Sequence, residues 1–326
     1  MINLNSLYLA AKIAMQYLSL GQIGDSEIKQ LKIFKAVVDC GGFSAAETEL
    51  NISRPAISNH IANLEARLNM RLCKRGRGGF SMTVEGEVVY DQTRQLLERL
   101  EQFRNIINNL GVRPAGQLNI TLSDSFSNDP RCRLPSIFSG FCKRAPEVEL
   151  KVEVGKMSSM ENMVLNDKLD LAFIPYHRRL DGLNYLHLFT DEHYLYCAKE
   201  HPLFILPDTQ ITVQMINAAK MVHAGLKPHE EVHHMLSDMN LAGLSYHYET
   251  RISMAMSGQF ICFLPQEIAR PYVDSGELRA IATKTKHFTL GAAVISKKTA
   301  QPNRAKDLFL ETIRDIFSDT DTRAPY

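Results

Sequence analysis

Residues 229–233, His-Glu-Glu-Val-His, have the H-E-x-x-H spacing by which one helix can offer two zinc ligands and a general base. Because His229 and His233 are four residues apart, a helix would place both imidazoles on one face, next to the carboxylate of Glu230. The chemistry that this pattern would support is hydrolysis by a zinc-bound water. A zinc hydrolase is therefore the first hypothesis to weigh against the rest of the chain.

The surroundings of this motif do not favour a metalloprotease. Pro228 would place His229 in the first turn of any helix, and Leu236 and Met239 stand where the longer zinc motif has a glycine and a third histidine. Glu249 is the third ligand that a hydrolase would need. We expect a solvated surface helix here and keep the zinc hydrolase as the alternative. A metal-sensing role is a further alternative, carried by His223, His234 and His247.

No other catalytic apparatus is evident in the sequence. It has neither a glycine-rich phosphate-binding pattern nor a nucleophile elbow for a Ser/His/Asp triad. The six cysteines include no C-x-x-C pair, which argues against a disulfide framework and a cysteine-rich zinc site. Cys132 and Cys142 lie near one predicted helix and leave redox sensing as a weaker alternative. We therefore expect no catalytic residue, no metal and no cofactor, in a protein of the reducing cytoplasm.

Positive charge is concentrated in one part of the chain. The 326 residues have a formal net charge of +1 and are 45% hydrophobic, which suffices for two or three globular domains. Residues 51–80, by contrast, hold six basic residues and one acidic residue, Glu65. Such a local excess is typical of a surface that contacts phosphates, although a solvated basic face would also produce it.

The N-terminal extension, residues 1–27, is predicted to contain an amphipathic helix. Its apolar stretch carries Lys12 in the middle, has no basic segment before it and runs into polar residues. Neither a signal peptide nor a membrane span fits this pattern, so we expect no membrane partner.

Three short helices are predicted between residues 28 and 68. A glycine pair at 41–42 ends the first, Ser44 is an N-cap for the second, Asn51 closes it, and Ser53 caps the third. The second and third helices are then only three residues apart, which is typical of a helix-turn-helix.

The third helix has one apolar face and one small, polar face. The apolar residues recur at steps of four, three and four and are expected to be buried: Ile57, Ile61, Leu64 and Leu68. On the other side, Asn59 is flanked by Arg54, Ser58 and Asn63, with no bulky apolar residue beside it. Such a face can lie in the major groove of DNA and bond base edges, although any solvent-exposed helix is the alternative.

The stretch that follows, "CKRGRGGFSMT", alternates Lys74, Arg75 and Arg77 with glycines, as the tip of a hairpin would. From about residue 31 to residue 87 the sequence resembles the winged helix-turn-helix of LysR-type transcriptional regulators. The resemblance rests on Phe34, "FSAAETEL", "ISRPAISNHIANLEARL" and "RGRGGFSMTVEG". It implies an all-α winged helix-turn-helix at residues 28–83 that binds double-stranded DNA.

The resemblance also implies which side chains meet DNA. Residues of the third helix would contact bases or phosphates, and the cations of the wing would contact the DNA backbone. The candidates are Ser44, Ser53, Arg54, Pro55, Ser58, Asn59, Asn63, Lys74, Arg75 and Arg77. The family usually has glutamine where this chain has Arg54 and arginine where it has Asn59, so the recognised DNA sequence does not carry over.

Residues 84–113 are predicted to form one long linker and dimerisation helix, with Thr83 as its N-cap. Apolar positions spaced by four and three residues sustain a coiled-coil seam over three heptads. They are Val89, Thr93, Leu96, Leu100, Phe103, Ile107 and Leu110. We expect this seam to form a homodimer, and the family resemblance implies the same helix and further assembly into a tetramer. "GVRPAGQ", residues 111–117, then marks a domain boundary.

Residues 117–326 are predicted to be an α/β effector-binding domain of two lobes. "LNITLSD", "VELKVEVG" and "DLAFIP" read as strands separated by helices, which indicates a parallel sheet. The region resembles the effector-binding domain of the same family, which is akin to periplasmic binding proteins. On this basis lobe I spans about 117–186 and 288–326, and lobe II spans about 187–287.

Ligands of such sheets bind beyond the carboxyl ends of the strands, where loops present hydroxyl and N–H groups. The candidate effector-binding residues are Ser123, Ser125, Phe126, Ser127, Lys156, Ser158, Tyr176, His223 and Thr250, although serines in such loops can equally be helix caps. A small anionic effector suits hydroxyls, N–H groups and a few cations. The sequence thus predicts a DNA-binding regulator of LysR type, with RNA polymerase as a further candidate partner. A ligand-binding module without DNA activity is another alternative.

Overall fold

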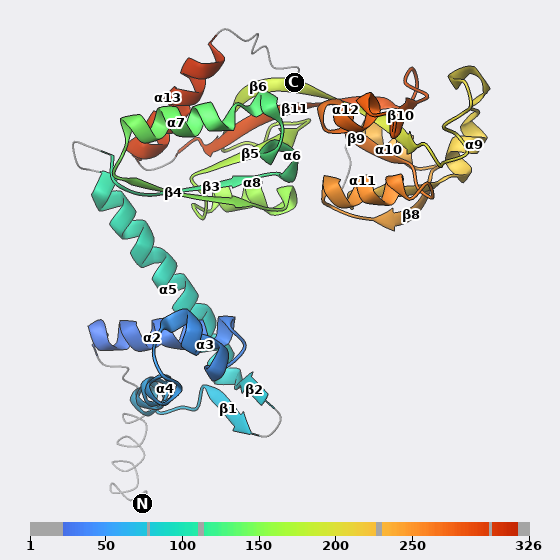
Figure 1. Ribbon diagram of the computed structural model, residues 1–326. Helices are drawn as coiled ribbons and strands as arrows, with labels where there is room; N and C mark the ends of the chain where they lie inside the picture. Colours follow the sequence, from blue (N-terminus) through green and yellow to red (C-terminus); the bar gives the residue numbers. More distant parts are fainter. Residues whose placement is uncertain (1–21, 77–78, 110–113, 226–229, 300–301, 319–326) are drawn as a thin grey trace, which may run out of the picture. The chain divides into compact units, whose positions relative to one another are not determined.

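The computed structural model describes residues 22–76, 79–109, 114–225, 230–299 and 302–318 (Figure 1). The chain divides into two compact units, residues 1–104 and 105–326, and each has a hydrophobic core of its own. The apolar stretch in which the N-terminal helix is predicted lies outside the described residues, as do Arg77, Leu110 and His229.

In its described residues, the first unit contains three helices, an antiparallel hairpin and the start of a long helix. In chain order these are α2 (Asp25–Asp39), α3 (Phe43–Leu50), α4 (Arg54–Leu68), β1 (Cys73–Gly76), β2 (Gly79–Met82) and α5 (Val84–Asn109). The core contains Phe34 and Val37 from α2 and the predicted stripe of α4, in which Ile57, Ile61 and Leu64 are at most 1% exposed. A three-helix head with a hairpin wing is therefore confirmed.

The second helix begins two residues earlier than its predicted cap would place it. Its N-cap is Gly42, and Ser44 lies inside α3 and is exposed, so the prediction that Ser44 caps this helix is wrong. Asn51 ends α3 as predicted, in the left-handed conformation with φ of 51°.

The start of α4 is satisfied by a neighbouring helix. Ser53 stands at the N-cap, as predicted, but its side chain makes no capping hydrogen bond. The backbone N–H of Arg54 instead donates to Oε1 of Glu47, at 2.5 Å. Because the first N–H groups of a helix have no partner within it, this carboxylate from α3 both caps α4 and fixes the turn between the two helices.

A buried carboxylate attaches the wing to α4. Oε1 of Glu65 accepts hydrogen bonds from the backbone N–H groups of Leu72 (2.8 Å) and Cys73 (3.1 Å), and Oε2 accepts one from Arg71 (2.9 Å). Burial alone would raise the pKa of Glu65, but the two backbone donors and the Arg71 guanidinium outweigh burial and lower it. Glu65 is therefore held ionised, as an acceptor for the beginning of β1.

Helix α5 starts as predicted, and its first turn packs closely on the segment before β1, at Arg71 and Leu72. Oγ1 of Thr83 accepts from the backbone N–H of Gly86 (2.9 Å) and donates to the carbonyl of Arg71 (2.6 Å). A Cβ on Gly86 would lie 2.1 Å from the carbonyl oxygen of Leu72, so only glycine permits this approach.

Among the described residues, no helix is both long and apolar enough to cross a membrane.

The second unit is built around one mixed sheet of seven strands. Its order is β10-β6-β11-β5-β3-β4, with β9 also paired to β6. The strands are β3 (Gly116–Leu122), β4 (Val148–Val154), β5 (Leu171–Tyr176), β6 (Leu183–Ala198), β9 (Cys262–Pro265), β10 (Leu278–Ile281) and β11 (His287–Lys297). β3, β4 and β5 are parallel, as the sequence predicts, whereas β6 and β11 pair antiparallel to their neighbours.

The parallel strands form a lobe with helices on both faces. Its helices, including the short 3-10 helix η1, are α6 (Asp124–Ser127), η1 (Pro130–Cys132), α7 (Leu134–Arg144), α8 (Met157–Leu165) and α13 (Arg304–Phe317). Leu171 and Phe173 of β5 face the core under α7 and α13, while Ala172 and Ile174 face the core under α8. Figure 1 shows α7 and α13 on one side of these strands and α8 on the other. This is lobe I.

Lobe II is formed around the far ends of β6 and β11. Its further elements are η2 (Asp208–Gln210), α9 (Val213–Ala218), β7 (Lys220–His223), α10 (Glu230–Leu236), β8 (Asn240–Leu244), α11 (Tyr248–Met256) and α12 (Gln266–Asp274). β7 and β8 pair in parallel, and Met221 forms a bridge with Ile261, the residue before β9. The two-lobed α/β fold is confirmed, with β6 and β11 as the strands that run from one lobe into the other.

Where β11 runs from one lobe to the other, one of its glycines packs closely on a tyrosine of β5. A Cβ on Gly291 of β11 would lie 2.4 Å from the ring of Tyr176, which is the residue paired with it at the end of β5. The Tyr176 hydroxyl is hydrogen-bonded to Nδ1 of His187 in β6, at 3.0 Å. The last residue of β5 is thus enclosed by both long strands.

Candidate functional sites

The outer face of α4 consists largely of exposed side chains. Arg54, Pro55, Asn59 and Asn63 are exposed, and Ser58 is half-buried. They lie opposite the stripe that packs into the core, because residues of a helix separated by about half a turn face in opposite directions. The helix therefore presents two amides and a guanidinium to the outside, which are groups that bond base edges in a major groove.

The positive charge of this unit is smaller at its surface than the sequence suggests. Arg67 forms an ion pair with Glu27 of α2 at 3.6 Å, and Arg71 pairs with Glu65. Lys74 is exposed at the start of the wing, and Arg75 lies opposite Phe80 in the hairpin register. Within residues 51–80, Arg54 at the start of α4 and Lys74 on the wing are therefore exposed cations for which no ion pair is found among the described residues.

The predicted seam of α5 has two parts. Val89 and Leu96 are half-buried against the core of the first unit, and Thr93 is 2% exposed. Further along, Leu100, Phe103 and Ile107 are 37%, 62% and 50% exposed. Among the described seam residues, those of this second part are the ones with uncovered apolar side chains.

A cavity of about 140 Å³ lies between the two lobes of the second unit. It is lined from lobe I by the end of β3 and the starts of α6 and α8, and from lobe II by β7, α10 and α11. Ser123 and His223 are the two predicted effector residues that line it.

The other predicted effector residues lie elsewhere. Ser125 and Phe126 line a smaller neighbouring space of about 10 Å³, and Phe126 is a core residue whose ring meets Phe173 edge-on. Tyr176 is buried against Gly291 and does not line the larger cavity. Four residues are exposed outside the lining: Ser127, Lys156, Ser158 and Thr250.

The sequence prediction missed an arginine in the wall of the cavity. Arg251 of α11 is 6% exposed, donates to the carbonyls of Phe263 (3.2 Å) and Tyr246 (3.4 Å), and lies over the ring of Tyr248, 4.0 Å from its centroid. Its Nε has no hydrogen-bond partner. The helical spacing from Tyr248 to Ala255 could have placed this cation on the inner face of α11.

The sequence prediction also missed the acid on the opposite wall. Asp124 begins α6 and is 6% exposed. Its Oδ1 accepts from the backbone N–H of Ser125 (3.0 Å), and its Oδ2 accepts from the backbone N–H of Tyr248 (2.9 Å), which is the first residue of α11. Asp124 thus connects lobe I to lobe II.

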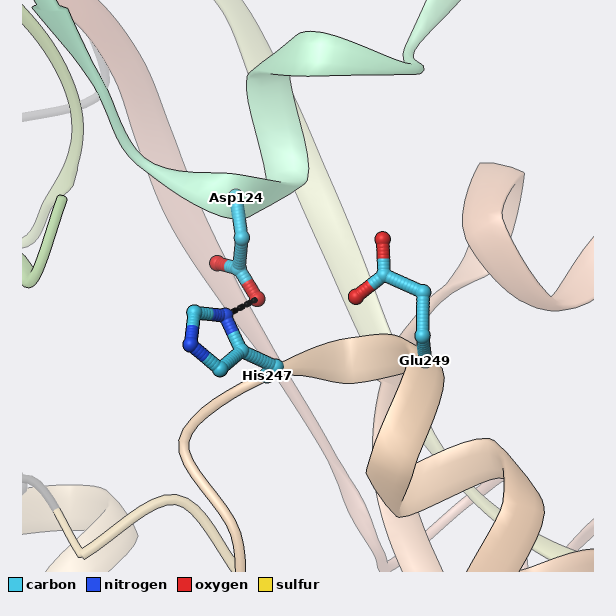
Figure 2. Close-up of side chains that lie close together, drawn as sticks. All are labelled: Asp124, His247 and Glu249. Atoms are coloured by element: carbon cyan, nitrogen blue, oxygen red, sulfur yellow. Dashed lines mark ion pairs between the residues drawn. The ribbon is translucent and has the colours of Figure 1, made fainter. Parts of the chain in front are cut away.

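Asp124 also belongs to a cluster of possible metal ligands. Figure 2 shows Asp124 directed toward His247 and Glu249, which come from the start of α11. Nδ1 of His247 lies 3.8 Å from Oδ2 of Asp124, and one ligand atom from each of the three residues lies within 4.8 Å of the others. His247 and Glu249 are exposed.

The H-E-x-x-H segment does not join this cluster. Glu230 is the first residue of α10, and Glu230 and His233 are both exposed. The cluster found among the described residues contains Glu249 but neither Glu230 nor His233, so the proposed third ligand is placed with different partners. A solvated helix describes His233 better than a zinc site does.

The cysteines give redox sensing little support. All six are free, Cys132 is buried, and Cys142 is exposed. Burial raises the pKa of the Cys132 thiol, which opposes formation of the reactive thiolate.

Two neutral side chains complete the wall beside Arg251. His193 is 3% exposed, and burial, reinforced by the nearby Arg251 charge, lowers its pKa to about 3. It is therefore an uncharged imidazole at neutral pH, stacked on Phe288 with ring centroids 4.8 Å apart. Burial raises the pKa of Tyr248 to about 12, so this phenol is also neutral.

Comparison with protein families gives matches along nearly the whole chain. Residues 28–87 match the bacterial regulatory helix-turn-helix protein of the lysR family, and residues 112–318 match the LysR substrate binding domain. The HTH-type transcriptional activator BauR of Pseudomonas aeruginosa is 35% identical over 295 residues, which cover 90% of this chain and 97% of that protein.

Solved structures show the same fold. Full-length CbnR, crystallised with its target DNA, is similar with a TM-score of 0.62 at 18% identity, covering 88% of this chain and 99% of CbnR. The virulence activator AphB of Vibrio cholerae is similar with a TM-score of 0.59 at 17% identity, covering 89% of this chain and 99% of AphB.

Proposed function

Since the chain belongs to the LysR family of DNA-binding transcriptional regulators, we propose that it reads DNA with α4 and responds to a small carboxylate bound between its lobes. The family consists of regulators, and the chain is accordingly not an enzyme. The proposal concerns what the family alone leaves open: which residues contact DNA, which chemistry the effector has, and how the chains assemble.

The two faces of α4 carry the proposal for DNA. One face is fixed in the core by Ile57, Ile61 and Leu64, so the opposite face, with Arg54 and Asn59, has a fixed direction. Side chains on a rigid helix can discriminate bases because little ordering is needed on binding. Lys74 and the other wing cations would contact phosphates, which contributes affinity without sequence preference.

Titration of DNA with point variants tests this assignment. The DNA is a fragment selected by the wild-type protein from a random pool. Arg54→Ala or Asn59→Ala should weaken binding to this fragment by about 1 to 3 kcal/mol and leave non-specific binding almost unchanged. Lys74→Ala should weaken both kinds of binding and reduce the salt dependence by about one unit of slope. Arg54→Ala and Asn59→Ala proteins that both keep wild-type affinity for the selected fragment would refute the assignment of α4.

Arg251 supports a carboxylate as effector. Its guanidinium is buried in the cavity wall and is bonded to neutral carbonyls, and among the described residues it forms no ion pair. A buried cation of this kind is stabilised by an anion that brings hydrogen-bond acceptors, and a planar carboxylate fits a guanidinium.

Thermal stabilisation of the full chain by a panel of small carboxylates tests the effector site. A ligand that binds only the native protein raises the melting temperature as its concentration exceeds the Kd. Arg251→Met should abolish the response, because it removes the charge but keeps much of the side-chain volume. Arg314→Met, on the exposed surface of α13, is the matched control and should respond as the wild type does. A carboxylate that stabilises both variants equally would exclude Arg251 as its partner.

We further propose that α5 forms the homodimer through its uncovered part, with Leu100, Phe103 and Ile107. Aliphatic and aromatic residues at this spacing are stabilised when a second helix covers them. A tetramer and a contact with RNA polymerase stay predictions from the family resemblance.

A further inference from the structure

The cavity between the lobes holds two buried charges of opposite sign. Its lining contains one carboxylate, Asp124, and one guanidinium, Arg251, besides three histidines. Each is 6% exposed, and no ion pair joins them. An isolated buried charge is unfavourable unless an opposite charge or several hydrogen bonds compensate it. Among the described residues, Arg251 has no carboxylate in contact, and Asp124 has only the His247 imidazole, 3.8 Å away, which is charged only when protonated.

The carboxylate of Asp124 has room for one more donor. It accepts from the backbone N–H groups of Ser125 and Tyr248 and from the hydroxyl of Ser123, at 3.3 Å in the last case. A carboxylate offers about four acceptor positions, so three donors do not saturate it. All three donors are neutral, and the nearby His247 carries charge only when protonated.

Arg251, in turn, has an N–H donor without an acceptor. Its Nε is buried without a hydrogen-bond partner, and its terminal nitrogens donate to carbonyl oxygens. The rest of the cavity lining is largely apolar and includes Val222, Phe288 and Leu290. Such a surface suits a short hydrocarbon chain between two charged ends.

We propose that the effector is a small amino acid whose ammonium group is bound by Asp124 and whose carboxylate is bound by Arg251. This inference rests on the proposed effector site and adds the recognition of the amino group. A zwitterion supplies an opposite charge to both buried groups at once. Its two ends attach to different lobes, since Asp124 starts α6 of lobe I and Arg251 lies on α11 of lobe II.

This position also connects the ligand to the lobe junction. Asp124 accepts from the first N–H of α11, and the hydroxyl of Tyr246 accepts from the N–H of Met157 at the start of α8, at 2.7 Å. Both bonds join the lobes beside the cavity. An ammonium bound to Asp124 therefore acts on a residue that already holds the two lobes together.

The experiment compares each amino acid with its analogue lacking the amino group. The panel contains α-amino acids and straight-chain ω-amino acids of two to six carbons, with the matching monocarboxylates and amines. Binding to the full chain is measured by thermal stabilisation and calorimetry. At least one amino acid should bind ten-fold or more tightly than its monocarboxylate and its amine. The length of the best ω-amino acid measures the separation of the two charged subsites.

Substitutions then assign the preference to Asp124. Asp124→Asn should reduce the preference for the amino acid over the monocarboxylate to less than three-fold, while monocarboxylate binding is kept. Glu249→Gln is the control, because Glu249 is exposed nearby but does not line the cavity, and it should keep the full preference. If Asp124→Asn proves unstable, the wild-type comparison of amino acids with monocarboxylates still decides the question.

The outcomes separate this inference from the proposed function. If monocarboxylates bind as tightly as amino acids, the ammonium subsite is wrong and the carboxylate effector stands. If no compound with a carboxylate binds, both are wrong. If Zn²⁺ alone binds at one ion per chain, and His247→Ala with Glu249→Gln removes it, the acidic side of the cavity is a metal site and the amino acid proposal is overturned.

Discussion

Glu65→Ala should detach the wing from the recognition helix and destabilise the first unit. The substitution removes the acceptor for two backbone N–H groups, those of Leu72 and Cys73, and both of these residues are buried. A buried donor left without a partner costs about 1 to 3 kcal/mol, so the loss is about 2 to 6 kcal/mol. The lost contact with Arg71 adds little, because that side chain is 77% exposed and surface ion pairs contribute about 0 to 1 kcal/mol.

Hydrogen–deuterium exchange of the full chain is the suitable assay, because the two units need not unfold together. Amides of α4 and β1 should exchange at least about 30-fold faster in Glu65→Ala, since each 1.36 kcal/mol corresponds to a factor of ten. Peptides of the second unit should not change. Glu65→Gln keeps an acceptor oxygen and should lie between the two proteins, and Arg71→Ala should resemble the wild type.

The pH dependence provides a second check on Glu65. Its pKa in the folded protein lies below the ordinary value of 4.5, so the ionised form is favoured by folding. The stabilisation is therefore present above about pH 4.5 and is lost as the pH falls through the folded pKa. Protection of β1 that is equal in the wild type and in Glu65→Ala would refute the role of this carboxylate in holding the wing.

Three further predictions concern the linker, the cavity and the zinc-like motif. Leu100→Glu with Phe103→Lys should cost several kcal/mol of assembly and reduce the mass measured by light scattering, and an unchanged mass in a folded protein would exclude α5 as the dimer seam. Burial lowers the folded pKa of His193 to about 3, so the wild type should lose stability as the pH falls from about 6.5 toward 3, and His193→Phe should lose less; identical pH profiles of the two melting temperatures would contradict this. His229→Ala with His233→Ala should change stability by no more than about 0.5 kcal/mol and leave DNA binding intact, whereas one zinc per chain in the wild type, lost in the double variant, would restore the hydrolase hypothesis.

The head could be predicted from the sequence because its signals are local. The spacing of Ile57, Ile61 and Leu64 decides which face of α4 is buried. Asn51 ends α3 because asparagine readily adopts the left-handed conformation of a helix C-cap. The caps were harder to predict. Glu47 reaches Arg54 from seven residues away, and a serine at position 53 gives no sign that a carboxylate will satisfy this helix start instead.

The cavity could be predicted only in part, because its residues come from distant segments. Ser123 was found because loops after parallel strands meet at one edge of a sheet. Arg251 and Asp124 are 127 positions apart in number and are brought to the same cavity by the return of the chain through lobe II. The strand order predicts hydroxyl-rich loops at the site, but it does not predict that a charge on the inner face of a helix lines it. Tyr176 was placed in the site by its loop, whereas β6 and β11 enclose it.

The contact between Tyr176 and Gly291 restricts how this protein can diverge. Any side chain at position 291 would meet the ring of Tyr176 at 2.4 Å, so a substitution there requires a smaller residue at position 176. A smaller residue at 176 would in turn deprive Nδ1 of His187 of its hydrogen-bond partner. The three positions are therefore expected to vary as a set among descendants of this sequence, with each single change less fit than the combination. The three positions lie where the strands cross from one lobe to the other, so their residue types record how the lobe junction is packed.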